Sequence, residues 1–276
     1  MSDSSIAIKV GLLNIRWYGI LIVSGMILAI LLAAWGAKRR KFSIDELLNL
    51  VLIAIPCGII GARLYYVVLM WDQIYAADPL SAFYIWRGGL AIHGALLGAI
   101  AGVLLYCHFK KIPFRAWADL MIPGVVLAQA IGRWGNFFNQ EAYGYVTNVP
   151  WAMYIRGAYR HPTFLYESLW DLSCFILLLI LTVKWKKHKD GDLLAVYFIY
   201  YSIGRFVVEC FRTDSLMLGG HKAISMALII KEAVKTGDMA LIWAYGVPMA
   251  LVISLVGIAA GLGILIYNRK KVCVVK

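Results

Sequence analysis

Long apolar stretches with few charges are the feature of this sequence that most restricts its fold. Residues 17–37 contain no charged side chain, and four basic residues follow at once. A helix needs about 20 apolar residues to cross the hydrocarbon core of a bilayer. Apolar residues make up 62% of the 276-residue chain and charged residues 15%, whereas soluble domains are about half apolar and a quarter charged. We therefore expect an integral membrane protein rather than a soluble or disordered chain.

Seven such stretches predict an all-α integral membrane protein with seven transmembrane helices. Helices and closed barrels are the structures that satisfy their backbone polar groups in lipid, and these runs are continuous rather than alternating, which favours helices. The predicted spans are about 17–37, 47–70, 88–107, 117–137, 164–183, 193–211 and 245–267. The first run is too long for a signal peptide and is followed, not preceded, by basic residues, so we expect no cleavable leader.

Basic residues give the predicted helices a direction. Four basic groups follow the first, third, fifth and seventh spans, at 38–41, 110–115, 184–189 and 269–276. Seven spans place all four groups on one side, which the positive-inside rule makes cytoplasmic. The N-terminus is then outside and the C-terminus inside. The net charge of +12 is explained by this topology, so we expect no nucleic acid among the partners. The five cysteines lack metal-binding spacing, and no metal site is predicted.

With this topology, most polar side chains of the spans and their outer ends fall into one layer of the outer leaflet. Arginine side chains can also reach the interface and serve as anchors, and a lone histidine is commonly a packing residue. A set contributed by several helices instead favours a functional cavity. Asp119 and Asp171 are expected to lie away from the layer. The layer contains Tyr18, Arg63, His93, Arg133, Asn136, Asn139, Glu141, His161, Tyr166, Glu167, Arg205 and Glu209.

The residue types in this layer suit an anionic phospholipid. Guanidinium groups bind phosphate through two parallel hydrogen bonds and remain charged, and a lipid head group lies at this depth. Arg205 and Glu209 are four residues apart on a predicted helix and can pair, which could be purely structural. His93 has the side chain best suited to accept a proton near neutral pH.

One segment resembles a known family. Residues 132–144 fit the pattern G-R-x-G-N-F-x-N-x-E-x-x-G, which is similar to the signature of the prolipoprotein diacylglyceryl transferases, a family of bacterial membrane enzymes. The resemblance extends in family order over about residues 14–215. Further similar segments are 16–19, 87–94, 161–168 and 204–212.

The resemblance implies a reaction and a location. It implies transfer of the diacylglyceryl group of phosphatidylglycerol to the lipobox cysteine of a preprolipoprotein, with a thioether formed and glycerol phosphate released. The partners are then phosphatidylglycerol, the preprolipoprotein lipobox peptide and membrane lipids, with no cofactor. The implied location is the bacterial cytoplasmic (inner) membrane, with several spans and an active site on the extracytoplasmic side. The implied fold is a seven-helix body with a small extracytoplasmic head, here residues 140–162.

The resemblance also suggests roles for residues of the polar layer. Arg133 and Arg205 would stabilise the phosphate and the leaving group, and His93 is the candidate base, although arginines alone could lower the pKa of the thiol. The catalytic candidates are His93, Arg133, Arg205, Tyr18 and Glu141. The substrate-binding candidates are Arg133, Asn136, Gly144, Asn139, Glu209, Arg63, Tyr166, Glu167 and His161.

Within this set, Glu209 would orient Arg205. Asn136 and Glu141 would hold head-group hydroxyls or fix Arg133, and Tyr18 would donate a hydrogen bond. Gly144 would permit a turn.

The chain departs from the family pattern in two places. Ala95 stands where a second glycine is expected. Residues 214–244 form a longer connection than the family usually has, expected on the extracytoplasmic side, and its apolar residues with flanking lysines could form an interfacial helix.

The alternative is a phospholipid-binding or transport protein without catalysis, although no inverted repeat is visible. An intramembrane hydrolase is disfavoured because there is no G-x-S-x-G motif and no pair of aspartates suited to acid–base chemistry. A retinal protein is excluded because the last span contains no lysine.

Overall fold

The computed structural model describes residues 6–10, 13–185, 187–214, 225–236 and 246–273. The predicted all-α membrane architecture is confirmed at the level of its helices, which are accompanied by two short β-hairpins. The chain divides into two compact units. The first unit contains Met1–Ala33 and Ala118–Lys276, and the second contains Ala34–Trp117.

Six helices of the described residues are long and apolar enough to cross a membrane. They are α1 (Trp17–Arg40), α2 (Ile44–Leu69), α3 (Ile92–Lys110), α4 (Phe114–Phe138), α5 (Thr163–Lys184) and α9 (Met249–Cys273). A further helix, α6 (Asp192–Glu209), has 18 residues but carries Asp192, Arg205 and Glu209 and is not among the six.

Local backbone chemistry explains where two of these helices begin. The Ser43 side chain accepts a hydrogen bond from the Glu46 amide at 3.3 Å, so α2 starts at Ile44, before the predicted span;. Gly88 and Gly89 have φ values of +87° and +76°, which an α-helix does not contain. Helix α3 therefore begins only at Ile92, and His93 lies in its first turn rather than more than a turn inside a helix.

In the second unit, α2 and α3 pack through small residues. A Cβ atom on Gly61 would overlap the carbonyl oxygen of Gly94, and one on Gly98 would overlap the carbonyl oxygen of Cys57. Small residues allow two membrane helices to approach this closely. Three short helical turns connect α2 to α3 along the chain. These are η1 (Trp71–Tyr75), η2 (Pro79–Phe83) and η3 (Ile85–Arg87).

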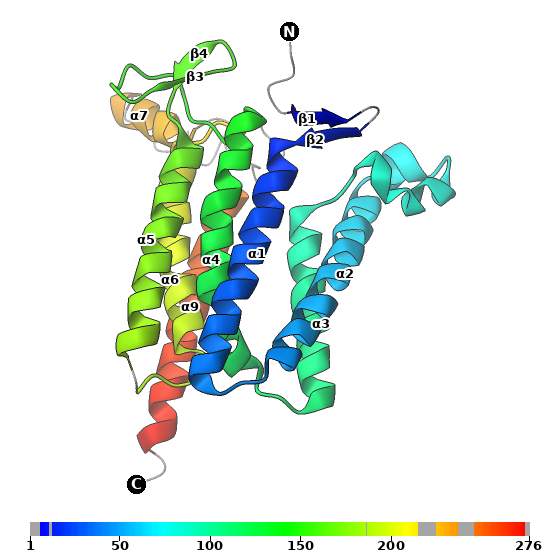
Figure 1. Cartoon of the computed structure of the whole chain (residues 1–276). Helices are drawn as coiled ribbons and strands as arrows, with labels where there is room; N and C mark the ends of the chain where they lie inside the picture. The colour runs from blue at the N-terminus through cyan, green and yellow to red at the C-terminus, as the bar shows by residue number, and fades with distance from the viewer. Residues whose placement is uncertain (1–5, 11–12, 186, 215–224, 237–245, 274–276) are drawn as a thin grey trace. The chain divides into compact units, whose positions relative to one another are not determined.

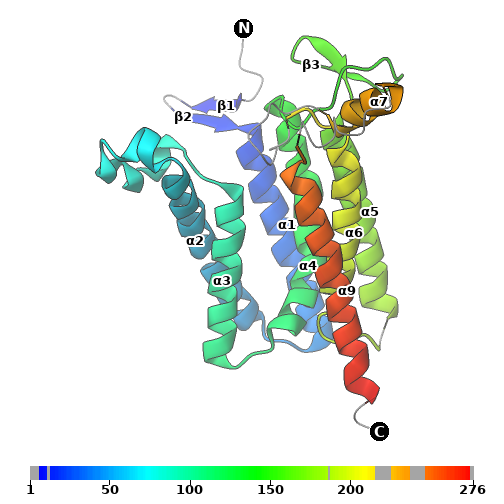
Figure 2. The same ribbon diagram turned by 180° about the vertical axis from the view of Figure 1, so that it is seen from behind.

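In the first unit, α4, α5, α6 and α9 run alongside one another, as both views of the ribbon show (Figures 1 and 2). The strands β3 (Met153–Ile155) and β4 (Ala158–Arg160) form an antiparallel hairpin within the predicted head. A second hairpin, of β1 (Ile6–Val10) and β2 (Leu13–Arg16), precedes α1 and was not expected from the sequence. Helix α7 (Met226–Thr236) lies in the predicted connection, of which 215–224 and 237–244 are outside the described residues.

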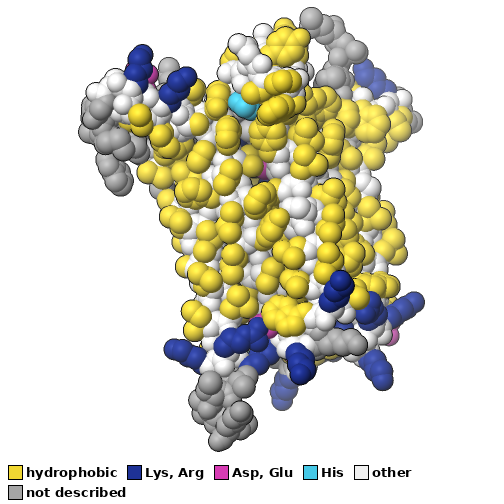
Figure 3. Space-filling view, turned by 90° about the vertical axis from the view of Figure 1, so that its left-hand side faces the viewer, with side chains coloured by type: hydrophobic (Ala, Val, Ile, Leu, Met, Phe, Trp, Pro, Cys, Tyr) yellow, Lys and Arg dark blue, Asp and Glu magenta, His cyan; other side chains and the backbone are white. Residues whose placement is uncertain are grey.

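The exposed face of helix α5 is apolar, and its buried face carries charged residues. Its exposed stripe consists of Leu169, Leu172, Ile176, Ile180 and Val183. Its buried side includes the carboxylates Glu167 and Asp171. Figure 3 shows this side of the molecule covered with apolar side chains over its middle, and lysine and arginine side chains at its lower end. An apolar surface around buried charges is the arrangement expected in lipid, and the chain is therefore a multi-pass membrane protein.

Polar contacts join three segments at the end of the first unit where α6 begins. The Lys189 ammonium donates to the carbonyl oxygen of Asn268, and the Arg269 guanidinium lies 3.2 Å from the carboxylate of Asp192. Asp119, which lies away from the arginine cluster, is buried and accepts hydrogen bonds from the amides of Gly191 and Leu194 at 2.8 Å each. These contacts join the start of α4, the start of α6 and the end of α9.

Candidate active site

Two arginines from different helices meet at one buried carboxylate. Nη1 of Arg133, on α4, lies 2.7 Å from Oε2 of Glu167, on α5. Nη1 of Arg205, on α6, donates to the other oxygen, Oε1, of the same carboxylate. The side chain of Glu167 is only 4% exposed. The sequence predicted that these three residues share one layer, and the structure brings them into direct contact.

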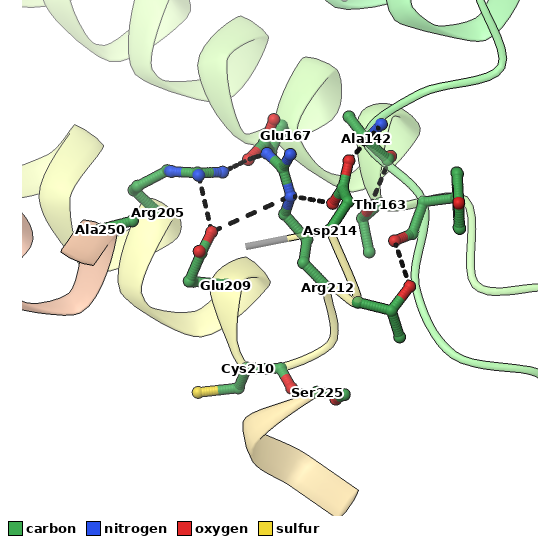
Figure 4. A network of polar contacts seen from close by, with 12 residues as sticks. Ala142, Thr163, Glu167, Arg205, Glu209, Cys210, Arg212, Asp214, Ser225 and Ala250 are labelled. Carbon is green, nitrogen blue, oxygen red and sulfur yellow. Dashed lines mark hydrogen bonds and ion pairs between the residues drawn. The ribbon is translucent and has the colours of Figure 1, made fainter. Parts of the chain in front are cut away.

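The cluster continues beyond the end of α6 (Figure 4). Nη2 of Arg205 lies 2.6 Å from Oε2 of Glu209, one helical turn later. Arg212 approaches the same groups, with its Nη1 3.7 Å from Oε1 of Glu167 and its Nε 4.0 Å from Oε2 of Glu209. Nε of Arg212 also donates to Oδ1 of Asp214 at 2.9 Å. Arg212 and Asp214 were not among the predicted site residues.

Arg133 has two further neighbours that the sequence did not assign to the site. Its Nη2 donates to the Tyr201 hydroxyl at 3.3 Å, and its Nε lies 3.9 Å from Oδ2 of the buried Asp171. The expectation that Asp171 lies away from the cluster is therefore wrong. Asp171 is four residues after Glu167, and residues at this spacing share one face of a helix.

The arginine side chains are more exposed than the carboxylates that hold them. The Arg133, Arg205 and Arg212 side chains are 21%, 19% and 14% exposed, whereas Glu167 and Glu209 are 4% and 1% exposed. Carboxylates behind the arginines fix the direction of their N–H groups before any ligand arrives. Fixed guanidinium groups at an accessible edge can bind an oxyanion and stabilise negative charge that grows during a reaction.

Arg212, which lies beyond the end of α6, stays charged because nearby carboxylates outweigh the effect of its burial. Burial by itself lowers the pKa of its guanidinium. The negative charge of Glu167, followed by the hydrogen bond and charge of Asp214, outweighs burial and raises the pKa above its ordinary value. Arg212 is therefore a permanent cation at the edge of the cluster.

The signature segment holds a second group of predicted residues together. Oε1 of Glu141 accepts hydrogen bonds from the Asn136 amide at 2.8 Å and from the Asn139 amide at 3.2 Å. A Cβ atom on Gly135 would overlap the ring of Tyr18, so this glycine lets α1 place the tyrosine against the segment. Tyr18, Asn136, Asn139 and Glu141 thus belong to one local arrangement, in which the two amides orient the carboxylate.

Gly144 is required for close packing rather than for a turn. A Cβ atom there would lie 2.7 Å from the Cβ of His161 and 2.9 Å from the carbonyl oxygen of Phe211. Its amide donates to the His161 carbonyl at 2.8 Å, and its φ is not in the left-handed region. The expected turn is replaced by a three-way contact between the end of the signature, the residues before α5 and the residues after α6.

His161 and Tyr166 form a short polar chain beside the head. Nδ1 of His161 lies 2.9 Å from the Tyr166 hydroxyl, which accepts a hydrogen bond from the Trp151 indole at 2.7 Å. The ring of His161 also packs against Tyr145 and Phe211. Burial lowers the pKa of His161. This histidine is therefore a neutral hydrogen-bonding group around neutral pH.

Two predicted site residues, Arg63 and His93, belong to the second unit. All five N–H groups of Arg63 point to backbone carbonyls at 2.7–3.4 Å;. Arg63 therefore holds the loop before α3, and within the described residues it keeps no N–H group for a phosphate. The His93 ring is exposed and lies 6.2 Å from the ring of Tyr65. The carbonyls bound by Arg63 are those of Ser81, Ala82, Tyr84, Gly88 and Gly89.

Known proteins place the chain in a family. Residues 5–267 match the family model described as prolipoprotein diacylglyceryl transferase. The chain is 45% identical over 260 residues to the phosphatidylglycerol–prolipoprotein diacylglyceryl transferase of Clostridioides difficile (strain 630), covering 94% of this chain and 93% of that one. It is 44% identical over 236 residues to the protein of that name from Streptococcus equi subsp. zooepidemicus (strain MGCS10565), covering 82% and 91%. The Synechococcus elongatus protein of that name is 42% identical over 258 residues, covering 88% of each chain. This chain belongs to the prolipoprotein diacylglyceryl transferase family.

Proposed function

We propose that this chain transfers the diacylglyceryl group of phosphatidylglycerol to the lipobox cysteine thiol of preprolipoproteins. A thioether forms and glycerol phosphate leaves, which is the first step of bacterial lipoprotein maturation. The observation that carries the proposal is the pair of arginines, Arg133 and Arg205, fixed on Glu167 within a chain of this family. The alternative is a phospholipid-binding or transport protein with the same cluster and no catalysis.

The chemistry requires positive charge at the phosphate. The thiol sulfur attacks an sp³ carbon of the glyceryl group, the carbon–oxygen bond to phosphate breaks, and the thiol proton must be removed. The leaving phosphate gains negative charge, so oriented cations lower the barrier. Arg133 and Arg205 are assigned this role because their side chains are partly exposed and the buried Glu167 carboxylate fixes their guanidinium groups. Glu209, 2.6 Å from Arg205, orients it.

The thiol attacks as a thiolate, and His93 is the proposed base. Its ring is exposed in the first turn of α3, which leaves it free to meet a substrate. The arginine cluster could instead lower the pKa of the thiol when substrate binds. Because the phosphate departs as a stabilised anion, the proposed mechanism uses no metal or other cofactor.

The remaining predicted residues are assigned to the head group and its surroundings. Glu141, oriented by Asn136 and Asn139, would accept hydrogen bonds from the glycerol hydroxyls, and Tyr18 would donate one beside them. Gly144, His161, Tyr166 and Glu167 would shape the same region. Arg63 is left out of the substrate site because backbone carbonyls already engage its N–H groups.

We also propose the placement of the chain in the bacterial cytoplasmic membrane. Helix α6 would be the seventh span, because its charged residues face the buried cluster at one end and the Asp192 contacts at the other. The basic ends of α1, α5 and α9 would face the cytoplasm;. The arginine cluster, the head at 140–162 and α7, as an interfacial helix, would then face the extracytoplasmic side.

The test is a transfer assay on the purified full-length chain. Vesicles of phosphatidylglycerol and a synthetic lipobox peptide are supplied, and peptide mass gain and glycerol phosphate release are measured. The wild type should produce both, Arg133→Ala neither, and the control Arg39→Ala, at the opposite end of α1 from Tyr18, should keep wild-type rates. Lipid binding by the wild type without either product would favour the non-catalytic alternative.

A further inference from the structure

The residues that follow α6 pair with the end of the signature segment. The Tyr145 amide donates to the Phe211 carbonyl at 3.2 Å, and the Thr213 amide donates to the Tyr143 carbonyl at 3.3 Å. Between them, Gly144 and Arg212 form an antiparallel bridge. Residues 211–214 therefore act as a short clamp on residues 142–145.

The clamp meets a residue with an unfavourable backbone conformation. Ala142 has a φ of +55°, in the left-handed region that side chains with a Cβ atom rarely adopt;. Its carbonyl accepts hydrogen bonds from the Thr163 hydroxyl at 2.6 Å and the Phe164 amide at 3.1 Å. Its amide donates to Oδ2 of Asp214 at 3.0 Å. Such a conformation persists when surrounding contacts hold it on both sides, and Asp214 supplies the contact on the amide side.

The second oxygen of Asp214 reaches into the arginine cluster. Oδ1 accepts the hydrogen bond from Nε of Arg212 at 2.9 Å, and the guanidinium of Arg212 continues toward Glu167 (Figure 4). One carboxylate therefore connects two parts of the candidate site. On one side is the backbone directly after Glu141, and on the other is a cation of the cluster.

We propose that Asp214 is a positioning residue that sets the placement of Glu141 and of Arg212 at the same time. The inference rests on the proposed transfer function. Asp214 acts through the Ala142 amide and the Arg212 guanidinium, and it does not touch the reacting atoms. When it is absent, the left-handed turn at Ala142 relaxes and Arg212 loses its orientation, so both sides of the site shift relative to the bound head group.

Two acceptor oxygens are the chemical requirement at this position. The Ala142 amide and Nε of Arg212 are both donors, and each uses a different oxygen of Asp214. In asparagine an NH2 group replaces one of the two oxygens, so one of the two donors faces another donor. Alanine satisfies neither. Asp214→Asn should therefore cause an intermediate loss and Asp214→Ala the full loss.

The experiment compares wild type, Asp214→Ala and Asp214→Asn in the transfer assay, with Asp78→Ala as a matched control. Asp78 is an exposed aspartate whose side chain caps no helix. Small misplacements of reacting groups lower rates by about 100-fold, so kcat should fall on the order of 100-fold in Asp214→Ala and about tenfold in Asp214→Asn. Asp78→Ala should match the wild type. Thermal unfolding in detergent shows whether each variant is folded.

A second measurement separates positioning from general stabilisation. Ala142→Gly removes the Cβ penalty of the left-handed conformation, so the backbone depends less on Asp214. In that background, Asp214→Ala should lower kcat only about tenfold, since only the Arg212 contact is then lost. Equal losses in both backgrounds would overturn the link through Ala142.

The outcomes distinguish this inference from the proposed function. A wild type without transfer activity would refute the proposed function. An active wild type with an Asp214→Ala variant of undiminished kcat would overturn the positioning role alone. If Asp214→Ala does not fold, Asp214→Asn decides, and a wild-type kcat in that variant would overturn the role.

Discussion

Arg133 and Arg205 contact opposite oxygens of a single buried carboxylate, that of Glu167. Two guanidinium groups repel one another, and the repulsion is strong where water is scarce. The shared carboxylate allows both to remain charged and close together beneath an apolar surface. A bound phosphate would use the N–H groups that the carboxylate leaves accessible.

The first prediction concerns this shared carboxylate. Glu167→Gln removes the charge, and its amide nitrogen would face one of the two arginines as a second donor. Breaking a buried ion pair by neutralising one partner costs about 3 kcal/mol, so the thermal midpoint should fall and kcat/KM should drop by about 100-fold or more. Glu232→Gln, on the exposed side of α7, is the control and should behave as wild type. An unchanged kcat/KM in Glu167→Gln would show that the arginines do not need their common partner.

The second prediction concerns the geometry of Arg205. Its Nη1 and Nη2 contact Glu167 and Glu209 respectively, and the planar fork serves both carboxylates at once. Lysine keeps the charge but has a single ammonium group. Arg205→Lys should therefore lower kcat by about 100-fold with the fold retained, whereas Arg39→Lys should be neutral. Wild-type turnover in Arg205→Lys would show that the positive charge of residue 205 is sufficient and that the geometry of the guanidinium group is not needed.

The third prediction tests His93 as the base. Glutamine preserves hydrogen bonding but accepts no proton at the relevant pH. If His93 removes the thiol proton, His93→Gln should lower kcat by about 100-fold, and the fall of kcat at acid pH should disappear from the pH profile. His108→Gln, at the other end of α3, is the matched control. A His93→Gln variant that keeps both its rate and its pH profile would leave thiolate formation to the arginines.

The arginine layer could be predicted from the sequence because charged residues within long apolar runs are conspicuous. Once the alternating direction of the helices is counted, Arg133 and Arg205 fall at one depth, and the structure joins them at Glu167. The spacing between Glu167 and Asp171 also carried a signal, since it indicates one helical face.

Other parts of the site depend on loop conformations that apolar patterns do not describe. The sequence predicted Arg63 as a substrate-binding residue. In the structure its N–H groups donate to five backbone carbonyl oxygens of the loop before α3. Arg212 and Asp214 lie just beyond the last apolar residues of their span, so the apolar pattern does not mark them as buried charges. The β3–β4 hairpin has only the two-residue turn Arg156-Gly157, with φ values of +49° and +81°, as a local cue;.

The last prediction concerns the pH dependence of stability through His161. Burial lowers the pKa of this histidine in the folded state, so the unfolded chain takes up a proton more readily than the folded one. Its contribution to stability is therefore complete above the pKa of an unfolded histidine, about 6.5, and is lost as the pH falls below it. The thermal midpoint of the wild type should decline from pH 7 to pH 5, and His161→Gln should decline less over the same range. A His161→Gln variant with the same pH dependence as the wild type would assign the decline to other groups.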